Sequence, residues 1–339
     1  MYESIQDMDE RALEKTPGEA GVEDYIHKAY ENLKKGDAAS ALRLLKGALE
    51  IDYEHKEVLY ALKCLNWWLE KIKRLDDFRD SYEKGGYLLS QWKSYYGFLD
   101  FIGDSWFPDN GSLPIDAGDS CQYALKHFIY SRALSYFLEL LGEGTNQQDP
   151  ELLLQIGRCC KGAGNWEEAL KYLEQAGRFR KDDGAILLEL ADINALMGDD
   201  RAAKVLFREA FFLDPSGINL GGLESEMILS LLDKVKEMGY SGQELTEWIP
   251  VWGCIWGIFS VKRELKPVEL GRLKQSILSL ENEYRNKPDG HELIKPRLLN
   301  RYFWLIDYCE HNRDTSGLMD ETMLKIKFID PAVYEQYRT

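Results

Sequence analysis

Apolar and small residues recur with a regular spacing in the middle of the chain. On each side of a central glycine, apolar residues are spaced by three and four, which predicts one amphipathic helix before the turn and one after it. A unit of this size cannot bury its apolar face alone and stacks on its neighbours. The pattern predicts two helix–turn–helix repeats, at 150–183 and 184–217. Residues of the same kind stand 34 positions apart in the two copies: Leu153 and Leu187, Ile156 and Leu190, Gly164 and Gly198, Ala169 and Ala203, Leu173 and Phe207, Ala176 and Ala210.

Small residues at matching positions predict close helix packing within each repeat. Gly157 and Ala191 on the first helices, and Ala169 and Ala203 on the second helices, carry almost no side chain. Two helix axes can then approach to the short end of the usual separation of about 8–10 Å. We expect a larger residue at any of these positions to push the two helices apart.

The repeated residues resemble two tetratricopeptide repeats. The copies depart from the family pattern at Cys160 and Asn194, where a large apolar residue is usual, and at Lys181, where the family has a proline. The resemblance implies an all-α solenoid, a right-handed superhelix of helix–turn–helix units. It also implies a non-catalytic scaffold or adaptor that binds a peptide or partner protein in a concave groove. The matching residues are Gly157, Gly164, Asn165, Trp166, Glu167, Glu168, Ala169, Leu173, Ala176, Gly198, Asp199, Ala203, Phe207, Ala210 and Pro215.

The rest of the chain continues the helical pattern less regularly. Degenerate repeats are predicted near 22–55 and near 300–333. An aromatic-rich insertion at 66–123 lacks a clear turn glycine, so we expect helices longer than those of a repeat, with an exposed loop at 103–119. The predicted organisation is an acidic tail at 1–21, a repeat-like array at 22–220, and a C-terminal helical region at 221–339 that packs on the array or extends it.

Composition narrows the range of partners. An apolar content of 45% is ample for a core. The formal net charge of -16 opposes binding to nucleic acid or to an anionic membrane, because such binding depends on Lys and Arg. The N-terminus lacks the basic and apolar regions of a signal peptide, and the six cysteines favour reduced, buried thiols, so a cytoplasmic location is expected.

The sequence contains no recognisable catalytic motif. The cysteines form no CxxC pair, and no histidine has a second histidine or a cysteine three or four residues away, so no metal site or cofactor is predicted. We find no Walker A loop, HExxH or GxSxG sequence, and we predict that the chain is not an enzyme. The alternative is an enzyme or regulator with its site in the non-repeat segments 66–123 or 221–299.

The resemblance also implies which residues line the concave groove. Leu154 and Leu188 would form an apolar floor between charged walls. Such a groove suits an extended or helical segment that carries both apolar anchors and charge. Alternatively, these residues form a solvated inner face or pack against the C-terminal helices of the same chain. The predicted peptide-binding residues are Glu151, Leu154, Arg158, Lys161, Leu188, Asp192 and Ala195.

The segment Trp248–Phe259 is nearly uncharged and needs a separate interpretation. The whole uncharged stretch, Trp248–Val261, is about 14 residues long and contains Pro250, so it is shorter than the roughly 20 residues that a membrane span requires. A buried helix is the favoured prediction. The alternative is a face through which the chain assembles into a structural homo-oligomer.

Overall fold

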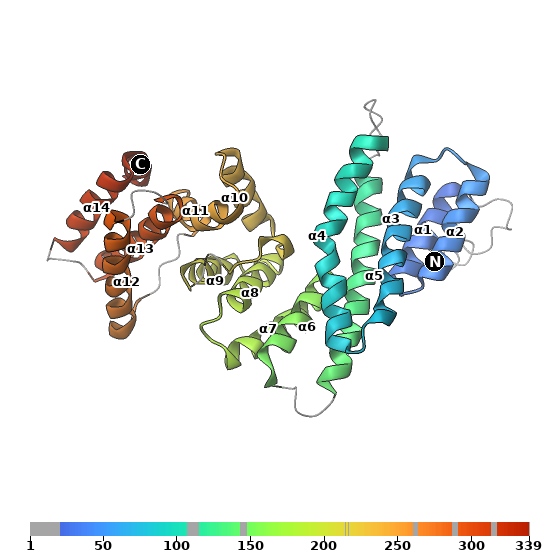
Figure 1. The fold of residues 1–339 in the computed structure, drawn as a ribbon, viewed down its shortest axis with the longest axis horizontal. Helices are drawn as coiled ribbons and strands as arrows, with labels where there is room; N and C mark the ends of the chain where they lie inside the picture. The colour runs from blue at the N-terminus through green and yellow to red at the C-terminus, as the bar shows by residue number, and fades with distance from the viewer. Residues whose placement is uncertain are drawn as a thin grey trace, which may run out of the picture. The chain divides into compact units, whose positions relative to one another are not determined.

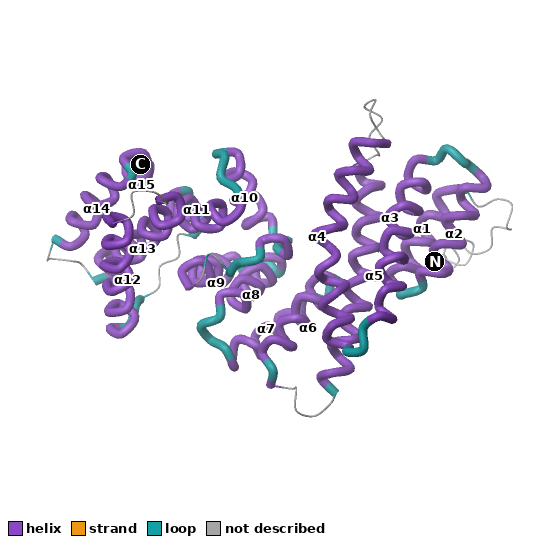
Figure 2. The backbone as a smooth tube through the Cα atoms, in the orientation of Figure 1, coloured by secondary structure: helices purple, strands orange, loops and turns teal. Residues whose placement is uncertain are grey.

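The computed structural model describes residues 21–106, 115–142, 148–213, 215, 217–259, 264–286, 291–312 and 317–338. Fifteen α-helices and short 3-10 turns make up the regular structure of these residues, which contain no strand (Figure 1, Figure 2). The predicted all-α class is confirmed. The predicted acidic tail lies almost entirely outside the described residues.

The chain divides into two compact units. Unit 1 comprises residues 1–146 with 162–165, and unit 2 comprises residues 147–161 with 166–339. The sequence placed a boundary at 220, whereas α8 (Gly184–Leu196) and α9 (Asp200–Leu213) fall in the same unit as the C-terminal helices. The physical reason is a shared hydrophobic core, to which α8 and α9 contribute buried side chains together with the helices that follow.

Unit 1 contains two helices that are much longer than those of a repeat. In the ribbon, α4 and α5 run side by side, and α1 packs against both α2 and α5 (Figure 1). The expectation of long helices in the insertion is therefore confirmed. Helices extend into the predicted loop at 103–119 from both sides, and its centre, 107–114, lies outside the described residues. The helices are α1 (Val22–Lys34), α2 (Ala38–Ile51), α3 (Lys56–Lys73), α4 (Ser81–Trp106) and α5 (Ile115–Leu141).

Aromatic residues of the insertion form the core between α3 and α4. Trp68 and Tyr95 are fully buried, and the centres of their rings lie 5.0 Å apart. Trp92 packs on both rings, 4.8 Å from Trp68 and 5.3 Å from Tyr95. Large rings bury much apolar area per residue, so this cluster stabilises helices that have no repeat partner.

Unit 2 is built from consecutive helices that pack on their neighbours. Helix α7 packs on α8, α8 on α9, and α9 on α11, while α13 contacts α11, α12 and α14. Close packing follows the predicted small residues, since a Cβ atom on Gly157 would lie 2.6 Å from Leu173. The helices are α6 (Pro150–Gly162), α7 (Trp166–Phe179), α8 (Gly184–Leu196), α9 (Asp200–Leu213), α10 (Glu226–Glu237), α11 (Gly242–Ile255), α12 (Pro267–Asn286), α13 (His291–His311), α14 (Leu318–Ile329) and α15 (Pro331–Arg338).

The same turn chemistry joins three of the helix pairs. Gly36, Gly164 and Gly198 all have a left-handed backbone conformation, with φ of 86°, 78° and 85°. Glycine adopts this conformation without steric cost, so it ends the first helix of each pair. The next residue caps the second helix in two pairs, because Asp37 accepts a bond from the Ser40 amide and Asp199 accepts one from the Ala202 amide. The predicted helix–turn–helix pattern is thus confirmed at these positions.

The uncharged segment Trp248–Phe259 lies mainly inside unit 2. Trp248, Trp252 and Phe259 are at most 4% exposed, which confirms the predicted buried helix. Gly253 allows the Phe259 ring to close against α11, since a Cβ atom there would lie 2.5 Å from that ring. Little of this face is therefore available for assembly between copies of the chain. None of the described helices combines the length and the apolar content that crossing a membrane requires.

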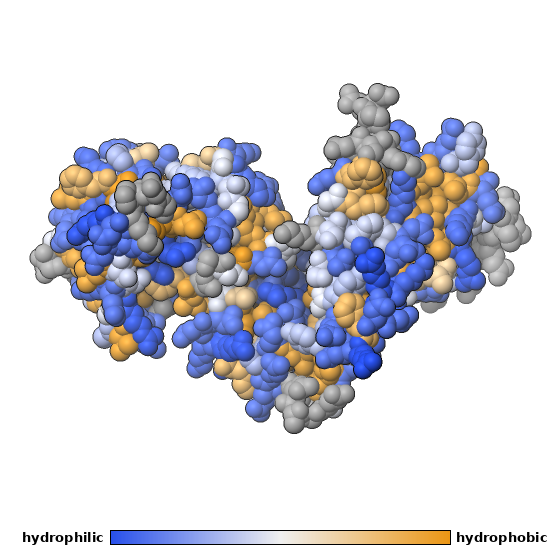
Figure 3. Space-filling view, in the orientation of Figure 1, coloured by the Kyte–Doolittle hydropathy of each residue, from blue (hydrophilic) through white to orange (hydrophobic). Residues whose placement is uncertain are grey.

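Hydrophilic residues cover much of the face drawn in Figure 3, with apolar patches between them. Exposed apolar side chains include Phe328 and Leu324 on α14, which are 89% and 55% exposed. Scattered exposure of this kind is normal for a protein surface.

Overpacking of the repeat interface should destabilise the protein. Ala169 is fully buried between its helices, so Ala169→Leu should lower the free energy of unfolding by about 1–3 kcal/mol. Urea denaturation measures this change. The control is Glu168→Leu, whose side chain is 54% exposed on the same helix and should tolerate the larger residue. Equal midpoints for the two variants would contradict the packing argument.

Candidate functional site

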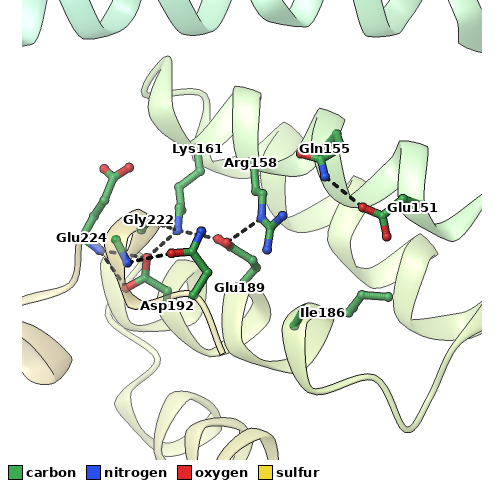
Figure 4. Close-up of polar contacts among 12 residues, drawn as sticks. Glu151, Gln155, Arg158, Lys161, Ile186, Glu189, Asp192, Gly222 and Glu224 are labelled. Carbon is green, nitrogen blue, oxygen red and sulfur yellow. Dashed lines mark hydrogen bonds and ion pairs between the residues drawn. The ribbon is translucent and has the colours of Figure 1, made fainter. Parts of the chain in front are cut away.

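Four charged side chains on the first helices of the two repeats meet in one cluster. Lys161 on α6 donates from Nζ to Glu189 Oε2 and to Asp192 Oδ2, both at 2.6 Å. Arg158, one turn earlier on α6, donates from Nε to Glu189 Oε1 at 2.8 Å. Figure 4 shows these side chains pointing toward one another between the two helices. The cluster links the two repeats through charge-assisted hydrogen bonds.

The cluster also holds a short stretch of main chain that follows α9. Lys161 Nζ donates to the carbonyl oxygen of Gly222 at 2.9 Å. The carboxylate of Asp192 accepts from the amide of Glu224 at 3.0 Å and from the amide of Ser225 at 2.9 Å (Figure 4). These bonds run to peptide groups and not to side chains. Residues 222–225, which we call the inner segment, are thus fixed on the α6–α8 face by their backbone.

Burial makes these charges strongly interdependent. Lys161 and Glu189 are each 2% exposed, and Asp192 is fully buried. Burial alone would lower the pKa of Lys161, but the Glu189 and Asp192 carboxylates more than offset it and raise that pKa. Burial alone would raise the pKa of Glu189, but the charges of Lys161 and Arg158 reverse the effect and lower it. Lys161 and Glu189 therefore both remain ionised near neutral pH.

The structure separates the predicted peptide-binding residues into two groups. Leu154 is 2% exposed and Leu188 is fully buried, so neither forms the accessible apolar floor that was expected. The reason for Leu188 is that it belongs to the hydrophobic core of unit 2. Lys161 and Asp192 are buried as well, since they bind the inner segment. The side chains of Glu151 and Arg158 keep 41% and 23% exposure, and Ala195 is half-buried.

Sequence reasoning missed Glu189 and the inner segment. A signal for Glu189 was present, because Glu189 and Asp192 are the only charged residues in the apolar run 186–193. A carboxylate placed among buried leucines requires a cationic partner. The inner segment had no comparable signal, since it is held by peptide groups that every sequence possesses.

Unit 1 contains a second cluster of titratable groups, around two buried thiols. Cys64 on α3 and Cys121 on α5 are at most 1% exposed. A hydrogen bond from Cys121 is the main cause that lowers the pKa of Cys64, and the same bond raises the pKa of Cys121. Gln122 donates from Nε2 to Tyr60 Oη at 2.8 Å beside them. A nucleophile must reach its substrate, so the burial of both thiols disfavours a reactive role.

The charged groups of the α6–α8 face satisfy one another and the peptide groups of the inner segment. Across the described ranges, no three His, Cys, Asp or Glu side chains are grouped to hold a metal ion. Of the predicted residues, Lys161 and Asp192 contact the inner segment, Arg158 contacts Glu189, and Glu151 accepts from Gln155 on the same helix.

Removal of the central lysine should be costly. Lys161→Met leaves Glu189 and Asp192 buried without their main cation, and should lower the free energy of unfolding by about 3–5 kcal/mol. Denaturant titration measures the loss. Lys171→Met is the control, because this lysine is 67% exposed and its ion pair with Glu168 on the helix surface is worth less than about 1 kcal/mol. A similar loss in both variants would show that the cluster does not depend on Lys161.

The acid dependence of stability should identify Glu189. Its pKa is lower in the folded state than in the unfolded chain, where Glu titrates near 4.3. Its stabilising contribution is therefore complete above about pH 4.3 and is lost as pH falls through the folded pKa. Between pH 5 and pH 3, the unfolding free energy of the parent should fall more steeply than that of Glu189→Gln. Parallel curves would assign the acid dependence to other carboxylates.

Comparison with known proteins supplies no family assignment. No protein-family model matches the chain, and no curated protein matches it. The resemblance to tetratricopeptide repeats therefore rests on the repeated residues themselves.

Proposed function

We propose that the chain is a non-catalytic interaction scaffold that binds a segment of a partner protein along the α6–α8 face. One observation carries this proposal. Side chains from two successive first helices hold the short stretch of main chain from the end of a 3-10 turn to the start of α10 through its peptide groups. The face therefore has the chemistry needed to bind an extended polypeptide, and it binds one from its own chain.

The inner segment limits where a partner can bind. Lys161 and Asp192 are already used, and the predicted leucine floor is buried. The accessible edge of the same face carries Glu151, Gln155 and Arg158, of which Gln155 donates to Glu151 at 2.9 Å. An acid, an amide and a base in this row favour a partner segment that offers charge and backbone groups, with fewer apolar anchors than the sequence predicted.

The arrangement of the scaffold is part of the proposal. We infer a tetratricopeptide-like solenoid in which helix pairs stack with a right-handed superhelical rise. Support comes from the shared left-handed glycine in three helix pairs and from the consecutive packing of α7, α8 and α9. We also place this function in the cytoplasm, because all six cysteines are free thiols and five of them are buried.

A pair of neutral substitutions tests the accessible edge. The double variant Glu151→Gln with Arg158→Gln removes one charge of each sign and keeps hydrogen-bonding capacity. Partners captured by the parent chain from a native lysate should be retained at least about tenfold less by this variant, since hydrogen bonds to charged groups contribute about 1.5–3 kcal/mol each. The readout is quantitative mass spectrometry of retained proteins.

The matched control is Glu168→Gln with Lys171→Gln on α7. It also removes one charge of each sign from an exposed pair, but on the second helix of the repeat. Melting curves for both double variants establish that each is folded. Equal retention of every partner by the two variants would contradict binding at this edge.

A further inference from the structure

A cavity of about 300 Å³ lies within unit 2, away from the α6–α8 face. Its walls come from the start of α8, the end of α9, the first half of α12 and the middle of α13. Leu187, Leu265 and Leu273 form apolar walls, together with Phe212. This volume is at the lower end of the range for small-molecule sites. The cavity can therefore take a compact ligand with an apolar body.

Arg301 lines this cavity, and its guanidinium is poorly compensated. Two of its nitrogen atoms, Nε and Nη1, are buried and have no hydrogen-bond partner in the described part of the chain. Arg301 as a whole is half-buried, but buried donor atoms without a partner are costly and therefore rare in structural positions. This cation is the observation that points to a ligand.

Two neighbouring arginines of the same unit are each paired with a carboxylate of the chain. Arg208 on α9 pairs with Asp307, and Arg297 on α13 pairs with the buried Glu247. Each of these guanidinium groups thus has its own carboxylate within the chain. Arg301 is one helical turn from Arg297 and lacks such a carboxylate among the described residues.

The surroundings of Arg301 disfavour its charge. Burial and, second to it, the nearby Arg297 guanidinium lower the pKa of Arg301 to about 10. Partial compensation comes from Phe212, whose ring centre lies 3.8 Å from the guanidinium carbon. Trp304 packs behind that ring at 4.7 Å and holds it in place. A cation–π contact contributes about 0.5–2 kcal/mol, less than a buried ion pair requires.

We propose that this cavity binds a small organic carboxylate, with the anion on the Arg301 guanidinium and the apolar body against the leucine walls and Phe212. A planar guanidinium matches a carboxylate through paired hydrogen bonds. The charged residues of the lining balance, which favours a ligand with one negative charge over a phosphate with two. They are Lys181, Arg272 and Arg301 against Asp182, Glu209 and Glu269.

The carboxylate has two chemical sources, a free acid or the C-terminus of a polypeptide. Both present the same anion beside an apolar group. The site uses none of the residues of the α6–α8 face. The proposal therefore goes beyond the proposed scaffold function and can be tested independently of it.

Thermal melting of the full chain with defined probes tests the proposal. Phenylacetate at a concentration 100-fold above its Kd should raise the Tm by about 5–10 °C. Phenylacetamide, which has the same shape without the charge, should raise it far less. A short peptide ending in phenylalanine is compared as its free acid and its C-terminal amide. Stabilisation by the acid peptide assigns a polypeptide terminus, and stabilisation by phenylacetate alone assigns a free acid.

Substitution of the arginine separates a ligand site from a structural contact. Arg301→Met should abolish the response to phenylacetate, yet the ligand-free variant should melt no lower than the parent, because an uncompensated buried cation has been removed. Arg178→Met on α7 changes the net charge equally at a side chain that is 79% exposed, and should keep the full response.

Three results would overturn the proposal. The first is an equal response to phenylacetate in Arg301→Met and the parent. The second is equal stabilisation by phenylacetamide or by inorganic phosphate. The third is the absence of any shift with either carboxylate probe, measured together with a lower Tm for ligand-free Arg301→Met, which would make Arg301 a structural residue.

Discussion

The interaction on which unit 2 depends most is the contact of the Lys161 ammonium with two buried carboxylates. An apolar helix such as α8 packs readily on its neighbours, but Glu189 and Asp192 oblige it to pack in one register. Only when the lysine of α6 lies opposite both carboxylates are all three charges compensated. The ion cluster therefore fixes the register in which one repeat packs on the next. Contacts between leucines alone would specify this register less strictly. The same carboxylate of Asp192 then binds the amides of Glu224 and Ser225, so the path of the chain after α9 follows from this register.

The arginines of unit 2 can be compared by the same requirement, that a charge removed from water has a partner of opposite sign. Arg208 and Arg297 meet it through Asp307 and Glu247. Arg301 does not, and its position on a cavity distinguishes it from an arginine that is merely packed. A stable fold tolerates few charges without a partner, so the unpaired Arg301 is more informative about function than the paired Arg208 and Arg297.

The helical class and the turns of the fold were predictable because they are encoded locally. Apolar spacing defines a helix within a dozen residues, and Gly164 or Gly198 marks a left-handed turn without reference to distant parts of the chain. The candidate site was predictable only in part. Arg158, Lys161 and Asp192 were found through the family resemblance, but the burial of Leu188 depends on a core that it shares with helices far along the chain. The division into units near residue 147 likewise follows from long-range packing, for which the sequence carries no local mark.

The two candidate sites differ in how their polar groups can recognise a ligand. On the α6–α8 face, the charges contact carbonyl and amide groups, which are common to all sequences, so the inner segment is recognised by its shape and its direction. In the cavity, the Arg301 guanidinium lies against the Phe212 ring, beside leucines and other charged side chains, and that combination selects for chemical type. Backbone recognition suits a surface that accommodates varied polypeptides, whereas a cation without its own carboxylate discriminates between an acid and its neutral analogue. The proposed scaffold, with both kinds of site, would have one surface for a protein and a separate means of responding to a small anion.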